Sequence, residues 1–413
     1  ALSGQSSGSV DYSVAAFTVA VNQASGQADP VRSGTISYTA VFSSAVAGGT
    51  FTAADVSNSG TAPGVSFAVS SLDNINWTIT ASGMSGSGTV IPTIASGGVT
   101  DAYGNTNAAS TSSDNTVTWD VTVPVITFSS VSGGNPGNSL TPTILGTVSK
   151  ASTVTLYYDG TCSTAKSTPA ANTVFASPGI ALTGNVNANT TTIIYAKAVD
   201  ALGNASTCAT LVTYTHDGTS PAVVSVSSSK GNGSYKAGEV IAVEVTFNDT
   251  VTVTGAPTLT LETGAVDTAV NYTSGSGTAV LTFNYTVAAG DTSADLDYVS
   301  TTALSLASGT IKDSVGNNAD LTLPTAGGAS SLGGQKNLVI DTTAPTVTYT
   351  SISPGTTGSS LTPQVTLVVS EAAGTSLRLY SDSGCTIAAS AAGTGTSGSN
   401  TVTGVSSNFI NDI

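Results

Sequence analysis

The stretch Asp200-Ala-Leu-Gly-Asn204, followed by Asp217-Gly-Thr-Ser-Pro221, decides how this 413-residue chain is divided. The same pair of signatures recurs twice, as Asp101–Asn105 with Asp120–Pro124 and as Asp313–Asn317 with Asp341–Pro345. Asp accepts hydrogen bonds from the backbone that follows it, and Gly-Asn tolerates a positive φ, so each first element predicts a tight turn. A β-prone run separates the two elements. We expect this run to be the last strand of a domain, and Asp-x-x-x-Pro to be the hinge into the next one.

The composition favours a folded, all-β chain. Hydrophobic residues make up 39% of the sequence, and Thr and Val, which favour strands, are abundant. Apolar and polar residues alternate with period 2 in Ile241–Phe247 and Ala279–Tyr285, whereas no run of ten or more residues has a helical period. The 45 glycines also suit a disordered chain, but the apolar content and the regularly spaced strands favour folding. A single hydrophobic core does not extend over a chain of this length, so we expect three or four domains.

The charge balance excludes some partners. Nine Lys and Arg stand against 24 Asp and Glu, giving a net charge of −15, which argues against a nucleic-acid partner because phosphate binding needs clustered basic residues. An acidic chain remains soluble outside the cell and can collect divalent cations. No stretch approaches the roughly twenty apolar residues of a membrane span, and the N-terminus has no signal-peptide pattern. We therefore expect no membrane insertion in this segment, and any export signal or anchor outside it.

The repeated signatures resemble the bacterial immunoglobulin-like repeats of large surface adhesins, in which an Asp-x-x-Gly-Asn hairpin and an Asp-x-x-x-Pro junction recur. The resemblance covers nearly the whole chain and includes Phe17–Gln23 and Phe51–Val56, which are similar to one subtype of these repeats. It implies tandem immunoglobulin-like β-sandwich domains in an elongated array. The expected units are a tail of a preceding unit at residues 1–11 and domains at residues 12–120, 121–217, 218–341 and 342–413.

The cysteines follow an internal repeat. Ser139–Pro142 of the second domain matches Ser360–Pro363 of the fourth, and we expect the fourth domain to be incomplete at its C-terminus. Cys162 and Cys208 are predicted to form a disulfide within the second domain, with two separate buried thiols as the alternative. Cys385 matches Cys162, so we expect its partner beyond this sequence. Such a bridge implies an oxidising compartment.

The aspartates at the junctions are candidate ligands for Ca²⁺, which related adhesin repeats hold at such places. The resemblance pairs the turn and hinge aspartates of each domain: Asp101 with Asp120, Asp200 with Asp217, and Asp313 with Asp341. Asp249 and Glu371 are weaker additions. Because Ca²⁺ takes roughly six to eight oxygen ligands, no single motif would suffice. The alternative is that these aspartates cap turns through side-chain hydrogen bonds, which alone explains Asp followed by Gly-Asn.

We expect no enzymatic activity. A hydrolase needs a nucleophile with a base, or a positioned pair of acids. The only histidine, His216, stands immediately before a hinge aspartate, and we expect it to be a surface linker residue. The sequence contains no Gly-x-Ser-x-Gly, His-Glu-x-x-His or P-loop pattern.

The sequence therefore predicts a non-enzymatic stalk or spacer section of a bacterial extracellular adhesin or surface filament, which projects a distal binding region. Its expected partners are neighbouring immunoglobulin-like domains of the same longer chain, and the receptor is not identified. One alternative is a subunit of a multi-chain surface fibre or sheath, in which copies pair through edge strands. Another is a set of accessory modules of a secreted polysaccharide-degrading enzyme.

Overall fold

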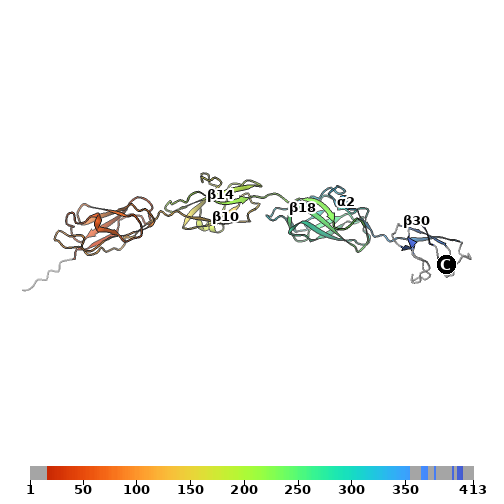
Figure 1. Cartoon of the computed structure of the whole chain (residues 1–413), viewed down its shortest axis with the longest axis horizontal. Helices are drawn as coiled ribbons and strands as arrows, with labels where there is room; N and C mark the ends of the chain where they lie inside the picture. Colours follow the sequence, from red (N-terminus) through yellow and green to blue (C-terminus); the bar gives the residue numbers. More distant parts are fainter. Residues whose placement is uncertain (1–15, 354–363, 371–375, 378–392, 395–397, 403–413) are drawn as a thin grey trace, which may run out of the picture. The chain divides into compact units, whose positions relative to one another are not determined.

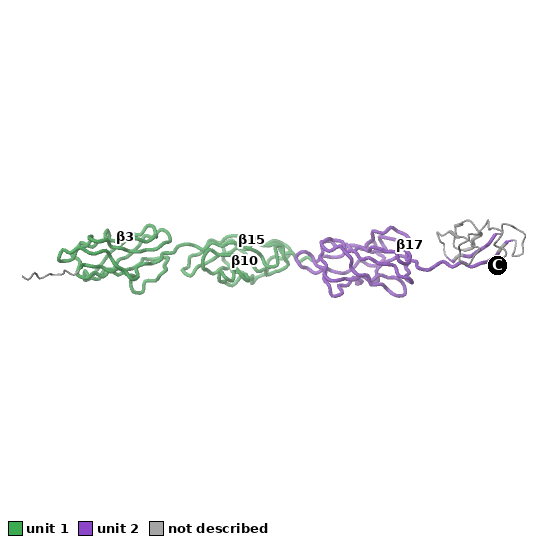
Figure 2. Tube along the Cα trace, turned by 90° about the horizontal axis from the view of Figure 1, so that it is seen from below, with its two compact units in different colours: residues 1–219 green, residues 220–413 purple. Residues whose placement is uncertain are grey.

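The computed structural model describes residues 16–353, 364–370, 376–377, 393–394 and 398–402 (Figure 1). Strands dominate these residues, which confirms the all-β fold. No helix in the described part of the chain is long and apolar enough to cross a membrane. The predictions for residues 1–11, Glu371, Cys385 and the closure of the fourth domain concern residues outside the described ones. The chain divides into two compact units between Thr219 and Ser220 (Figure 2).

The first sandwich, residues 17–119, lies in the first unit. Its main sheet has the order β1-β2-β5-β4, and the short pairs β3–β7 and β6–β8 form the opposing layer. Alternation turns one face of each strand inward, where the rings of Phe42, Phe51 and Trp77 stack edge to face in the core. The elements are β1 (Val19–Gln23), β2 (Ile36–Phe42), η1 (Ala53–Asp55), β3 (Val56–Asn58), β4 (Ser66–Ser71), β5 (Asn76–Ser82), β6 (Gly88–Val90), β7 (Pro92–Ile94) and β8 (Val117–Trp119).

The second sandwich, residues 126–215, has sheets of order β13-β10-β9 and β12-β11-β14-β15. Phe175 of α1 is fully buried against β10, and a Cβ on Gly146 would lie 2.3 Å from its ring, so only glycine fits there. The elements are β9 (Ile126–Val131), β10 (Thr143–Val148), β11 (Ser152–Tyr157), β12 (Ala170–Ala171), α1 (Asn172–Ala176), β13 (Ile180–Ala181), β14 (Thr191–Asp200) and β15 (Ala209–Thr215).

The third sandwich, residues 223–341, lies in the second unit and has the largest of three buried apolar clusters. Its main sheet follows β16-β18-β21-β20-β19-β23, with β24 also on β18, and its second sheet is β17-β25-β22. The two alternating runs pair antiparallel here, with Ile241 opposite Tyr285. The elements are β16 (Val223–Ser228), β17 (Gly233–Tyr235), β18 (Val240–Thr254), β19 (Thr258–Leu261), β20 (Thr268–Ser274), β21 (Thr278–Thr286), β22 (Thr292–Ser293), β23 (Leu304–Ser305), β24 (Thr310–Lys312), α2 (Leu332–Gln335) and β25 (Leu338–Asp341).

Further strands follow the third sandwich. β26 and β30 flank β27 in one sheet, and β28 pairs with β29. Their bounds are β26 (Val347–Ser353), β27 (Gln364–Val369), β28 (Ser376–Leu377), β29 (Gly393–Thr394) and β30 (Gly398–Val402).

In each sandwich a segment near the start of the chain's path runs parallel to a segment near its end. In the first sandwich, the N–H of Val21 donates to the carbonyl of Thr111 over 2.8 Å, and the N–H of Thr111 donates to the carbonyl of Val19 over 2.9 Å. Gly137 and His216 form a parallel bridge in the second sandwich, and β17 pairs parallel with β25 in the third. Because paired segments run in the same direction, the chain enters each sandwich at one end and leaves at the other.

Candidate functional site at the junction of the first two sandwiches

The Asp-x-x-Gly-Asn motif forms the same closed turn three times. Asp200 Oδ1 accepts hydrogen bonds from the N–H groups of Leu202 (3.0 Å) and Asn204 (2.8 Å), and Asp200 Oδ2 accepts from Asn204 Nδ2 (2.9 Å). The corresponding bonds at Asp101 and Asp313 measure 2.8 to 3.0 Å. The glycine of the turn has a positive φ, 86° at Gly203. The turn-capping alternative therefore describes these three aspartates.

The hinge aspartates are also held by local hydrogen bonds. In each case Oδ1 accepts from the N–H of the threonine two residues later, over 2.9 Å at Asp120 and 3.0 Å at Asp217 and Asp341. This is the geometry of an Asx turn, which fixes the direction in which the chain leaves the last strand.

The predicted pairing of Asp200 with Asp217 is wrong. Thr191, at the start of β14, lies opposite Thr215, so Asp217 follows beyond that end, whereas Asp200 is the last residue of β14. A strand of this length extends about 30 Å. The two carboxylates cannot share an ion.

The pairings of Asp101 with Asp120 and of Asp313 with Asp341 are wrong for the same reason. In the third sandwich, the N–H of Asp320, just after the Asp313 turn, donates to the carbonyl of Pro221, before β16 begins, whereas Asp341 ends β25, in which Ile340 pairs with Tyr235 at the end of β17. Near the Asp101 turn, the N–H of Ala108 donates to the carbonyl of Phe17, before β1 begins, whereas the backbone N–H of Asp120 donates to the carbonyl of Val31, after β1 ends. Each turn aspartate therefore lies at the entry end of its sandwich and each hinge aspartate at the exit end.

The structure instead brings Asp200 to the preceding hinge aspartate, with a lysine between them. Lys150 Nζ lies 2.6 Å from Asp120 Oδ2 and 2.7 Å from Asp200 Oδ2, and it donates to the carbonyl of Thr122 over 3.1 Å. Asp120 and Thr122 belong to the hinge, whereas Lys150 and Asp200 belong to the second sandwich. The Asp200 side chain is only 4% exposed, and those of Lys150 and Asp120 are about a quarter exposed. The ammonium thus joins the second sandwich to the end of the first.

Two further side chains complete this contact. Asn204 Nδ2 donates to the carbonyl of Asp120 over 3.0 Å, in addition to its bond within the turn. Arg32, from the first sandwich, donates to the carbonyl of Gly203 over 2.6 Å and lies 3.5 Å from Asn204 Oδ1. We call Arg32, Asp120, Lys150, Asp200 and Asn204 the junction cluster.

The electrostatics of the junction cluster keep all three ionisable groups of the lysine bridge charged. Burial alone would raise the pKa of Asp200, but the hydrogen bonds from Lys150 and Asn204 outweigh it and hold this pKa well below its usual range. The hydrogen bond from Lys150 lowers the pKa of Asp120. Burial would lower the pKa of Lys150, yet the two carboxylates raise it.

Sequence reasoning did not identify Arg32 and Lys150. Their rarity could have drawn attention to them, because they are the first two of only nine basic residues in the chain. The described residues contain no group of three or more His, Cys, Asp or Glu side chains that could hold a metal ion. The place between Asp120 and Asp200 is taken by the Lys150 ammonium. Calcium binding by the chain stays a prediction.

The position of Lys150 has counterparts in the neighbouring sandwiches. The preceding residue, Ser149, exchanges two hydrogen bonds of 3.0 Å with Val125 at the start of its sandwich. Asn248 and Ala222 exchange equivalent bonds in the third sandwich, which places Asp249 where the second has Lys150. In the first sandwich the equivalent residue is Ser44, whose hydroxyl donates to Asp101 Oδ2 over 3.3 Å.

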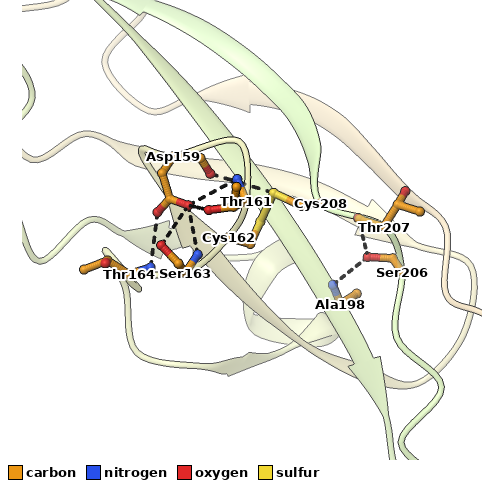
Figure 3. Close-up of a disulfide and its surroundings, with 9 residues drawn as sticks. All are labelled: Asp159, Thr161, Cys162, Ser163, Thr164, Ala198, Ser206, Thr207 and Cys208. Carbon is orange, nitrogen blue, oxygen red and sulfur yellow. Dashed lines mark hydrogen bonds between the residues drawn. A yellow bond between two sulfur atoms is a disulfide. The ribbon is translucent and has the colours of Figure 1, made fainter.

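The structure contains the predicted disulfide between Cys162 and Cys208 (Figure 3). The loop that carries Cys162 is organised by Asp159, whose carboxylate accepts from the N–H groups of Ser163 (2.9 Å) and Thr164 (3.1 Å). The hydrogen bond from the Thr161 hydroxyl, followed by those from the two N–H groups and the Ser163 hydroxyl, holds the pKa of Asp159 well below its usual range. The bridge therefore joins a preformed loop to the start of β15.

The expectation that His216 is a surface residue is wrong. The residue is buried, at 6% exposure, and both its backbone and its ring are hydrogen-bonded. Its N–H donates to the carbonyl of Thr190, and its Nδ1 accepts from the N–H of Asn189 over 3.0 Å. These contacts give His216 a structural role at the exit end of the second sandwich.

No protein-family model and no curated protein matches the chain. Among solved structures, the FN1–FN3 domains of chicken CNTN1 align at 11% identity with a TM-score of 0.26, covering 73% of this chain and 94% of that chain. Domains 1–6 of the surface layer protein SbsC align at 15% identity with a TM-score of 0.18, covering 86% of this chain and 57% of that chain. At such low TM-scores these matches carry no argument about what the chain binds or where it works.

Proposed function

We propose that this chain is a non-enzymatic stalk or spacer section of an extracellular surface protein of the adhesin or filament class. A spacer must transmit tension from one end of each domain to the other without unfolding. The observation that carries the proposal is the parallel pairing of a segment near the start with a segment near the end in all three sandwiches. The junction cluster supports it, because it ties the first sandwich to the second across the short hinge.

The parallel pairing suits a domain under tension. Hydrogen bonds between strands lie across the strand direction. When the two ends of the first sandwich are pulled apart, its terminal segments slide past each other, and the bonds among Val19, Val21 and Thr111 are loaded together. The bonds of an antiparallel terminal pair would instead break one after another from its open end.

The Cys162–Cys208 disulfide supports an extracellular location, because such bridges persist in oxidising compartments. It also limits how far the second sandwich can extend. The two cysteines are 46 residues apart, so the bridge removes about 160 Å from the length released when this sandwich unfolds.

Pulling single molecules of the full chain by its two ends tests this role. We expect separate unfolding events for the sandwiches, and one event that lengthens by about 160 Å when the disulfide is reduced. Thr111→Pro removes the N–H that donates to Val19 and changes an exposed side chain, so it should lower the unfolding force of the first sandwich. The third sandwich in the same molecule is the internal control.

An unchanged unfolding force for the first sandwich in the Thr111→Pro variant would contradict the spacer role of the terminal segments. The projected binding region, calcium at the other junctions and the enzyme-accessory alternative stay predictions. The alternative of copies that pair through edge strands rests on a separate observation, the uncovered edge of β4 in the first sandwich.

A further inference from the structure

The two edge strands of the main sheet of the first sandwich differ in whether another segment is hydrogen-bonded to their outer side. The outer edge of β1 is bonded along its length, through Val21 and Thr111 and through the N–H of Gln23, which donates to the carbonyl of Asp114 over 2.7 Å. The other edge is β4, whose only ladder partner among the described residues is β5. One side of this sheet is therefore closed and the other is open.

The register shows which groups of β4 face outward. The N–H of Phe42 on β2 donates to the carbonyl of Ile75, so alternate residues of β5 counted from Ile75 bond to β2. The residues between them bond to β4, and one of these, Thr80, lies opposite Ala68. Ala68 therefore directs its backbone groups to β5.

The backbone groups of Phe67 and Val69 then point away from the sheet. None of their N–H or carbonyl groups bonds to any residue that the structure describes outside the β4–β5 ladder. The short helix η1, which precedes β4 in the chain, lies close to it, but it supplies no hydrogen bond to either residue. Two donors and two acceptors thus stand in a row at strand spacing.

Nothing in β4 discourages pairing. Its sequence, Ser-Phe-Ala-Val-Ser-Ser, has no charge and no proline, and its register with β5 has no bulge. Exposed edges are normally protected by such features or by a covering segment. An edge strand of the second sandwich, β15 in its other sheet, shows such cover, since Asn135 bonds to Thr213 and Thr215 over 2.8 and 2.9 Å.

We infer that β4 is an interaction edge that pairs with β4 of a second copy of this chain. In the antiparallel arrangement centred on Ala68, Phe67 of one copy lies opposite Val69 of the other, and each outward N–H meets an outward carbonyl. The edge is thus electrostatically complementary to itself. The small side chains of Ala68 meet on the exposed face, and no formal charges meet along the seam, although the chain as a whole carries −15. At physiological salt, charges more than about 8 Å apart are largely screened.

Sedimentation of the full chain over a range of concentrations tests this inference. We expect a reversible dimer for the unchanged chain, and an Ala68→Lys variant whose dissociation constant is about tenfold higher or more, because two ammonium groups would then face each other at the centre of the seam. The exposed Ala265→Lys in a loop of the third sandwich adds the same charge elsewhere and should leave association unchanged.

A covalent trap reports the register. In the proposed pairing, two Ala68 residues form a pair without mutual hydrogen bonds, with Cα atoms about 4.5 Å apart, which permits a disulfide. In a Cys385→Ser background, Ala68→Cys should give an oxidised dimer and Ala265→Cys should not. A chain that stays monomeric at every soluble concentration, or an Ala68→Lys variant that associates as tightly as the unchanged chain, would overturn the inference.

Discussion

The Asp101 turn of the first sandwich and the Asp200 turn of the second have the same internal hydrogen bonds but different surroundings. Asp101 meets the hydroxyl of Ser44, whereas Asp200 meets the ammonium of Lys150 and, through it, Asp120. The motif itself therefore specifies only a turn. Whether that turn also joins two domains depends on the residue that follows the facing strand and on the hinge before the sandwich.

The two sandwiches differ in a second way that bears on stability. The second has the smallest of the three buried apolar clusters, and it alone of the described sandwiches contains a disulfide. A smaller core buries less apolar surface, so the free energy of burial exceeds the conformational entropy lost on folding by a smaller amount. The second sandwich therefore depends more on its cross-link and on its junction than the first.

The largest effect should follow from removing the bridge with the pair Cys162→Ser and Cys208→Ser. Closing a loop with a separation of 46 residues restricts the unfolded chain, so we expect the second sandwich to lose about 4 kcal/mol. Calorimetry and hydrogen exchange of β14 and β15 would measure this loss. Trp77 and Trp119, the only tryptophans, lie in the first sandwich, so their fluorescence should show an unchanged transition there. Equal losses in both sandwiches would contradict the greater dependence of the second sandwich on its cross-link.

Lys150→Met should have the next largest effect. The change leaves the carboxylates of Asp120 and Asp200 facing each other without a cation, and we expect a loss of about 2 kcal/mol in the second sandwich. The exposed Lys236→Met in the third sandwich is the matched control and should change stability by less than about 0.5 kcal/mol. Urea unfolding followed by hydrogen exchange of β14 would measure both. If the two variants lose the same stability, the lysine bridge does not stabilise the second sandwich.

The sequence predicted the local parts of this arrangement and missed the long-range ones. Asp followed by Gly-Asn specifies a turn through bonds that span four residues, and the alternation of Ile241–Phe247 specifies a strand. The contact of Arg32 with Gly203 spans 171 residues and leaves no local pattern. The wrong pairing of turn and hinge aspartates had another cause. A strand was predicted between them, and its length already separates them.

Acid should lower the stability of the second sandwich more in the unchanged chain than in the Lys150→Met variant. The folded pKa values of Asp120 and Asp200 lie below the unfolded value of about 3.9, so their contribution is complete only above about pH 5. As the pH falls, the unfolded chain binds protons first, and the contribution is lost as the pH passes through the folded pKa values. We expect the urea midpoint to fall as the pH is lowered from about pH 5 to about pH 2.

The slope of the urea midpoint against pH shows how much the lysine bridge contributes. In the Lys150→Met variant the lysine no longer lowers either pKa, so the midpoint should fall less over the same range. The first sandwich, read from tryptophan fluorescence in the same samples, accounts for acid effects unrelated to the junction. An identical slope with and without Lys150 would show that the turn bonds alone, and not the bridge, lower the two pKa values.

The smallest effect should come from Ser44→Lys, which gives the first sandwich the residue that the second has. The new ammonium would face Asp101, but no second carboxylate is hydrogen-bonded to this position among the described residues, in contrast to Asp120 beside Lys150. A lysine that meets only one carboxylate forms an ordinary ion pair near the surface. Such a pair stabilises the fold only slightly, and salt screens its attraction. We therefore expect a slight rise in the tryptophan-monitored melting temperature at low salt, and none at high salt. A rise as large as the fall caused by Lys150→Met would mean that the turn and the lysine suffice, and that the hinge aspartate adds little to the junction.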